Sequence, residues 1–149
     1  MSEVLFYHLE HQKLEQVLPL LLDKTLQRGW RAVVQTDSED HVKTLSNSLW
    51  TWREDSFLAH GSSEQGNGEH HPIWLCIDDQ NPNKAQVRFC VNGTTSQDPQ
   101  NFERTIYMFD GNDEDAVKQA RQQWKTLKDT DLEITYWRQD GNGRWEKKA

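Results

Sequence analysis

A cluster of acidic residues at positions 110–115 holds the side chains best suited to catalysis in this chain. Asp110 follows an apolar strand pattern, and carboxylates at the carboxyl end of a parallel strand are where α/β enzymes hold metal ions. One hypothesis is therefore a divalent-metal-dependent hydrolase or nuclease that uses Asp110 and Asp113. The alternative is structural: Asp110-Gly111 forms a turn, Asn112 or Asp113 caps a helix, and the other acids stabilise its dipole. Because every residue of the cluster already has such a task, we favour the structural interpretation.

Other catalytic and cofactor motifs are absent from the sequence. It has no GxxxxGK[ST] phosphate loop, no GxGxxG after a strand and no GxSxG nucleophile turn. Cys76 and Cys90 lie singly within apolar strand patterns, so we expect reduced, buried thiols. His70 and His71 are adjacent in a polar loop, where the two side chains cannot both face one metal ion from a regular element. The sequence therefore predicts no catalytic residue, no metal site and no cofactor.

Four cations share one face of the last predicted helix, which begins after Asp113. They are Lys118, Arg121, Lys125 and Lys128, at spacings i, i+3, i+7 and i+10 with no acidic residue interleaved. The adjoining apolar stripe includes Val117 and Trp124. Since the whole chain has a net charge of −7, this local basic stripe stands out. It predicts a site for an acidic partner, in which the planar guanidinium of Arg121 would be the cation best shaped to pair with a carboxylate.

Aromatic residues gather where the second predicted helix, over about residues 39–49, gives way to a loop. Trp50 follows the apolar positions of that helix and can complete their stripe. Trp52 and Phe57 come later, among polar residues, which is the composition of a protein-binding hot spot. The alternative is that all three rings pack under the following loop as a satellite of the core. As a binding surface, Trp50, Trp52 and Phe57 would contact a partner subunit.

Alternating strand and helix patterns must position these groups. The predicted strands cover residues 4–7, 30–34, 72–77, 86–91, 104–109 and 132–137, and helices follow the first, second and fifth of them. Gly29 is expected to end the first helix, and Thr36-Asp37-Ser38 offers capping oxygens to the second. Strands that alternate with helices at this spacing predict an α/β fold with a mostly parallel sheet and helices on both faces.

Length and composition limit the remaining possibilities. A chain of 149 residues predicts a single domain over residues 1–149, with an exposed loop at about 61–71 that has no hydrophobic residue. The net negative charge argues against a general nucleic-acid binder, so any role with DNA should be indirect. The sequence carries no signal-peptide pattern and no apolar run of membrane-spanning length, and we expect a cytoplasmic protein with no membrane contact.

Several of these segments together resemble the chi subunit family of bacterial DNA polymerase III, over nearly the whole chain. The matching segments are Phe6-Tyr7, Leu49-Trp50 with residues 55–60, the Asn81-Pro82-Asn83 turn, Phe109-Asp110-Gly111-Asn112, and Ala120-Arg121 through Trp124-Lys125. The resemblance implies an NTPase-like, Rossmann-like sheet without a phosphate loop. It also implies a non-catalytic adaptor of the clamp loader that binds the acidic C-terminal tail of single-stranded-DNA-binding protein.

The resemblance also implies which residues carry these contacts. The tail site would contain Val117, Arg121, Trp124, Lys125 and Tyr136, in agreement with the basic stripe, which adds Lys118. The surface for the psi subunit would include Trp50 and Phe57. Arg53 stands where the family pattern has an apolar residue or proline, so the partner at this surface is either psi or a replacement for it.

Overall fold

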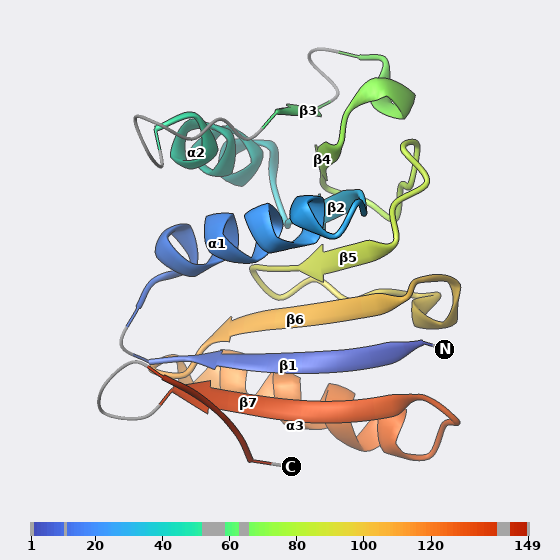
Figure 1. Ribbon diagram of the computed structural model, residues 1–149. Helices are drawn as coiled ribbons and strands as arrows, with labels where there is room; N and C mark the ends of the chain where they lie inside the picture. Colours follow the sequence, from blue (N-terminus) through green and yellow to red (C-terminus); the bar gives the residue numbers. More distant parts are fainter. Residues whose placement is uncertain (1, 11, 52–58, 63–65, 140–143, 149) are drawn as a thin grey trace.

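The computed structural model describes residues 2–10, 12–51, 59–62, 66–139 and 144–148. In these residues the chain forms one sheet of eight strands in the order β3-β4-β2-β5-β6-β1-β7-β8 (Figure 1). The strands are β1 (Glu3–Leu9), β2 (Ala32–Gln35), β3 (His60–Ser62), β4 (Ile73–Cys76), β5 (Val87–Cys90), β6 (Arg104–Asp110), β7 (Glu133–Gln139) and β8 (Trp145–Lys147). The helices are α1 (Leu14–Gln27), α2 (Glu39–Trp50) and α3 (Glu114–Lys128), with two 3₁₀ turns, η1 (Gly68–His70) and η2 (Pro99–Asn101).

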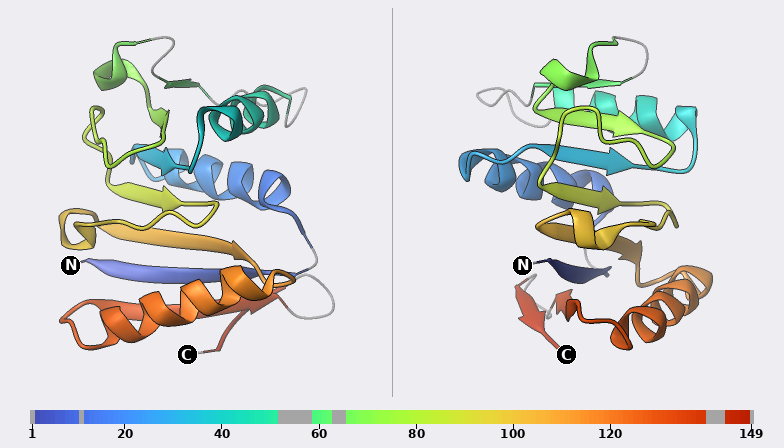
Figure 2. Two further views of the ribbon diagram at one scale, coloured as in Figure 1. Left: turned by 180° about the vertical axis from the view of Figure 1, so that it is seen from behind. Right: turned by 90° about the vertical axis from the view of Figure 1, so that its right-hand side faces the viewer.

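The sheet is parallel except at one edge. Neighbouring strands from β3 to β7 in the sheet order pair in parallel, and β8 pairs antiparallel with β7. Helices α1 and α3 lie on opposite faces of the sheet (Figure 2). The predicted α/β fold, with a mostly parallel sheet and helices on both faces, is confirmed.

Side chains alternate between the two faces along each strand, and this alternation divides the core in two. On β1, Leu5 belongs to the cluster that packs under α1 and α2, while Val4 and Phe6 belong to the cluster that packs under α3. We call these two sides the α1–α2 face and the α3 face. Since β1 is covered on both sides, its continuous apolar run has the burial that the sequence predicts.

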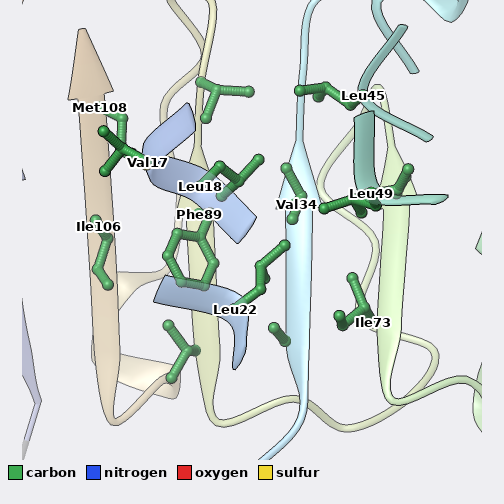
Figure 3. Close-up of a cluster of buried hydrophobic side chains, with 14 of the residues drawn as sticks. Val17, Leu18, Leu22, Val34, Leu45, Leu49, Ile73, Phe89, Ile106 and Met108 are labelled. Atoms are coloured by element: carbon green, nitrogen blue, oxygen red, sulfur yellow. The ribbon is translucent and has the colours of Figure 1, made fainter. Parts of the chain in front are cut away.

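Aliphatic side chains dominate the α1–α2 face. Leu18 and Leu22 of α1 and Leu49 of α2 are at most 1% exposed, and they meet strand residues such as Val34 and Phe89 (Figure 3). The apolar positions of both helices recur at helical spacing, which is why each helix buries one stripe against the sheet. This face is closed by two helices and forms the larger core.

The helix ends follow the local signals in the sequence. The Ser38 side chain accepts a hydrogen bond from His41 N at the start of α2, and Asp113 accepts from the backbone N–H groups of Asp115 and Ala116 at the start of α3. Gly29, just beyond α1, has φ +79°, a conformation that residues with a Cβ rarely adopt. All three predicted ends are confirmed.

Two sequence predictions are wrong, the first of them only in part. In the segment expected to be an exposed loop at about 61–71, residues 61–62 belong to buried strand β3, whereas Asn67, Glu69 and His70 are exposed as predicted and residues 63–65 lie outside the described residues. The polar residues of β3 still form a strand because β3 pairs with β4 and the His60 ring is within 2.9 Å of Ser46 Oγ. Trp50 does not complete the apolar stripe of α2: it is 49% exposed, while Leu49 is 1% exposed. Consecutive helical residues point about 100° apart, and Leu49 takes the buried direction.

The two cysteines are buried and free, as predicted. Burial raises the pKa of Cys76 to about 11 and the pKa of Cys90 to about 12, so both remain neutral thiols at physiological pH. Among the described residues, no helix combines the length and the apolar character needed to cross a bilayer.

Candidate functional site

Helix α3 carries the predicted basic stripe on its solvent side. Its start is fixed by the Asp113 cap, and Ala120 and Leu127 bury the opposite side against the sheet. The four cations of the stripe are all exposed: Lys118, Arg121, Lys125 and Lys128. The helix therefore presents a row of positive charge to solvent, beside its half-buried residues Val117 and Trp124.

Aromatic rings form the sheet surface beside this row. The Trp124 ring on α3 meets the Tyr136 ring on β7 edge to face, with 6.0 Å between centroids. Both lie over Phe6, at 5.6 Å and 6.5 Å, and Phe109 is 6.0 Å from Tyr136. Trp124 and Tyr136 are half-buried, so apolar ring area remains open between α3 and β7.

The predicted site residues therefore gather on one surface between α3 and β7. Trp124 and Tyr136 contact each other across it, and Arg121 and Lys125 lie on the same turn of α3 as Trp124. Val117 is half-buried one turn before Arg121, and Lys118 is exposed beside it. We call this surface the α3–β7 groove. Apolar area framed by cations suits an acidic peptide with an apolar end.

Three polar residues at the carboxyl ends of β1 and β7 extend the groove, and sequence reasoning missed them. His8 Nδ1 is 2.5 Å from the Tyr136 hydroxyl, and His8 Nε2 is 3.2 Å from Glu10 Oε1. Glu10 in turn forms an ion pair with Arg138. The alternation of β7 places Tyr136 and Arg138 on one face, which is the one signal that could have indicated Arg138. His8 and Glu10 carry no such signal, since their role depends on β1 lying beside β7.

Burial and charge set the protonation of this polar chain. Burial raises the pKa of Tyr136 above its ordinary value, and the positive charges of Arg138 and Arg121 oppose that rise. Burial lowers the pKa of His8, and Arg138 lowers it further, while Glu10 acts in the opposite direction. His8 is 7% exposed and is expected to be a neutral imidazole at pH 7. Both arginines therefore affect the pKa of His8 and of Tyr136.

The acidic cluster at 110–115 makes the hydrogen bonds that capping requires. Asp110 Oδ1 accepts from Asn112 N at 2.9 Å, and Asp113 Oδ1 accepts from Asp115 N at 3.0 Å. The cluster borders a cavity of about 710 Å³ at the carboxyl ends of β1, β5 and β6. In the described residues, no group of three or more His, Cys, Asp and Glu side chains is arranged to hold a metal ion. These contacts support the structural interpretation of the cluster.

Trp50, the one residue of the predicted partner surface that the structure describes, lies far from α3 along the sheet. Trp50 ends α2, next to β3 at one edge of the sheet, and α3 lies near the other edge (Figure 1). The exposed Trp50 ring rests on His60, with 4.4 Å between centroids. Trp52 and Phe57 fall outside the described residues. The structure thus separates Trp50 from the residues of α3 and β7 along the sheet.

The protein is therefore of the α/β class, with an open, mostly parallel sheet, and it carries exposed cations and half-buried aromatic rings beside its last helix. The family model described as DNA polymerase III chi subunit, HolC, matches residues 1–135, and the chain belongs to this family. The probable DNA polymerase III subunit chi of Rickettsia prowazekii (strain Madrid E) is 26% identical over 94 residues. That match covers 63% of this chain and 57% of the Rickettsia protein, a little over half of its length.

Proposed function

We propose that this protein is a non-catalytic accessory subunit of the DNA polymerase III holoenzyme. In this proposal it links the clamp loader to single-stranded-DNA-binding protein by binding the acidic C-terminal tail of that protein in the α3–β7 groove. The observation that carries the proposal is the edge-to-face pair of Trp124 and Tyr136 beside the exposed Arg121. Membership of the chi family supports the replication role.

Each part of the groove has a chemical counterpart in such a tail. The half-buried rings of Trp124 and Tyr136, with Val117, offer apolar area for a terminal apolar side chain. Arg121 offers a planar fork for the terminal carboxylate, which a lysine ammonium does not match. Lys118 and Lys125 then act as point charges for the acidic residues upstream, with less demand on geometry.

Substitution of Arg121 tests the groove directly. Arg121→Ala should lose about 2 kcal/mol or more in binding a synthetic acidic peptide ending in Pro-Phe, because it removes a charge-paired contact. Lys128→Ala removes the same charge from the exposed end of α3 and should lose under about 1 kcal/mol. The measurement is calorimetric titration. Unchanged binding by Arg121→Ala, or equal binding of a peptide with an amidated carboxyl terminus, would remove the groove from consideration.

We also propose that Trp50, Trp52 and Phe57 form the surface for a second holoenzyme subunit, either psi or a replacement for it. The exposure of Trp50, at 49%, supports this role because a large exposed aromatic is a frequent interface anchor. Trp50→Ala should weaken association with the clamp loader by about 2 kcal/mol while the fold stays intact. Ile77→Ala is the matched control, because Ile77 is also exposed, at 43%, and it lies just beyond the carboxyl end of β4.

Pull-down of clamp-loader proteins from native extract measures this association. Equal recovery with wild type and Trp50→Ala would exclude the surface, and equal losses with both variants would point to a general effect of surface apolar area. In the same proposal, residues 1–149 act as one domain in the cytoplasm without membrane contact. DNA contact is indirect, in keeping with the net charge of −7.

A further inference from the structure

The β7 wall of the α3–β7 groove carries a cation of its own. Tyr136 and Arg138 are two residues apart on β7, so their side chains leave the strand on the same side, toward α3. The Arg138 side chain is 48% exposed. The groove is therefore bordered by one arginine on α3, Arg121, and by a second on the facing strand.

Contacts from β1 hold Arg138 in place beside the aromatic rings. Nη2 of Arg138 contacts Oε1 of Glu10, and the same carboxylate oxygen is 3.2 Å from His8 Nε2. The other nitrogen of His8, Nδ1, is 2.5 Å from the Tyr136 hydroxyl. The Nδ1 atom and the Tyr136 hydroxyl are within hydrogen-bond distance, and the carboxylate of Glu10 is the polar group nearest to Nε2. Close polar contacts thus run from Arg138 through Glu10 and His8 to the Tyr136 ring that faces Trp124.

The guanidinium of Arg138 has donors for a second carboxylate. An arginine has five N–H donors in a fixed plane, and the contact to Glu10 is made through Nη2. Because the side chain is half exposed, a ligand can approach its other edge without displacing Glu10. The pairing with Glu10 also keeps two arginines near one groove without a large repulsion between them in the free protein.

We propose that Arg138 forms a second anion subsite of the groove, which takes a side-chain carboxylate of the acidic peptide while Arg121 takes its terminal carboxylate. This inference rests on the proposed function. This subsite should give the protein a higher affinity for a peptide with acidic residues upstream of its apolar end than for a neutral peptide with the same end. Glu10 and His8 are positioning residues that hold Arg138 beside Tyr136.

A cycle of protein and peptide variants tests the subsite by calorimetric titration. Arg138→Ala should weaken binding of an acidic peptide ending in Pro-Phe at least fivefold. It should weaken binding less than twofold when the Asp residues of the peptide are replaced by Asn, because the ligand of Arg138 is then missing. The fivefold loss should persist with a peptide whose carboxyl terminus is amidated, because the terminal carboxylate is expected to bind Arg121 and not Arg138. Arg138→Gln, with a longer side chain than alanine, should give the same pattern.

Arg28→Ala is the charge-matched control, at an exposed residue just beyond α1, and should change affinity less than twofold. An equal loss for the Asp and Asn peptides would overturn the subsite. So would unchanged binding in Arg138→Ala while Arg121→Ala still weakens it, an outcome that leaves the proposed function standing. If neither arginine variant weakens binding, the proposed function fails as well.

Discussion

The two faces of the sheet differ in what fills them and in how far they are closed. The α1–α2 face is packed mainly by buried Leu, Val and Ile side chains under two helices, and its half-buried aromatic rings are Tyr7, Trp30, Trp137 and Trp145. The α3 face has one long helix over Phe6, Tyr107 and half-buried Trp124 and Tyr136. Two helices and aliphatic packing make one face a scaffold, while on the other face a row of exposed cations on α3 lies beside half-buried rings. In the proposed function, the same strands support the core on one side and a peptide-binding surface on the other.

The largest expected effect is on stability, at the α1–α2 face. Phe89 is fully buried in this core, and Phe89→Ala should lower the free energy of unfolding by about 3–5 kcal/mol through lost transfer energy and a cavity. Trp124→Ala removes a larger ring from the α3 face, yet should cost about half as much because that ring is half exposed. Urea unfolding measures both. Equal losses would mean that the α3 face is as much a part of the scaffold as the other.

A smaller effect is expected in the pH dependence of stability, and it arises at the α3 face. His8 has a lowered pKa in the folded protein, so below the ordinary value of about 6.5 the unfolded chain binds more protons than the folded one. Stability should therefore fall as the pH drops from about 7 toward the lowered pKa. His8→Leu removes this proton linkage and should flatten the decline.

Thermal unfolding between pH 7.5 and 5.5 measures this slope. A second histidine variant, His70→Gln at an exposed side chain in η1, shows the effect of a surface substitution on the unfolding midpoint. An unchanged slope in His8→Leu would show that the buried pair of His8 and Tyr136 does not control the titration.

Sequence patterns predicted the features that depend on nearby residues. The caps at Ser38 and Asp113 and the exposed cations of α3 follow from spacing within one helix. Strand β3 was missed because its three residues are polar and gain their hydrogen bonds from β4, eleven residues or more along the chain. Trp50 was assigned to a buried stripe because apolar character alone does not say which of two adjacent residues faces the core.

At the candidate site too, local sequence patterns predicted the residues that share one helix but not the contacts between distant strands. Val117, Arg121 and Trp124 share one helix, so their spacing predicted a common surface. The chain from Arg138 through Glu10 and His8 to Tyr136 depends on β1 and β7 being neighbours, although about 130 residues separate them in the sequence. Strand order is a tertiary property that local patterns do not contain. The groove wall on β7 was therefore only partly predicted.

The most direct test of the central claim is the location of an acidic peptide on the protein, mapped by amide chemical shifts. On titration with an acidic peptide ending in Pro-Phe, we expect the largest changes at residues 117–125 of α3 and 136–138 of β7. The amides of α1 and α2 should change little, because the scaffold face lies across the sheet from the groove. Changes centred on α1, α2 or Trp50, with none along α3, would contradict the assignment of recognition to the α3 face.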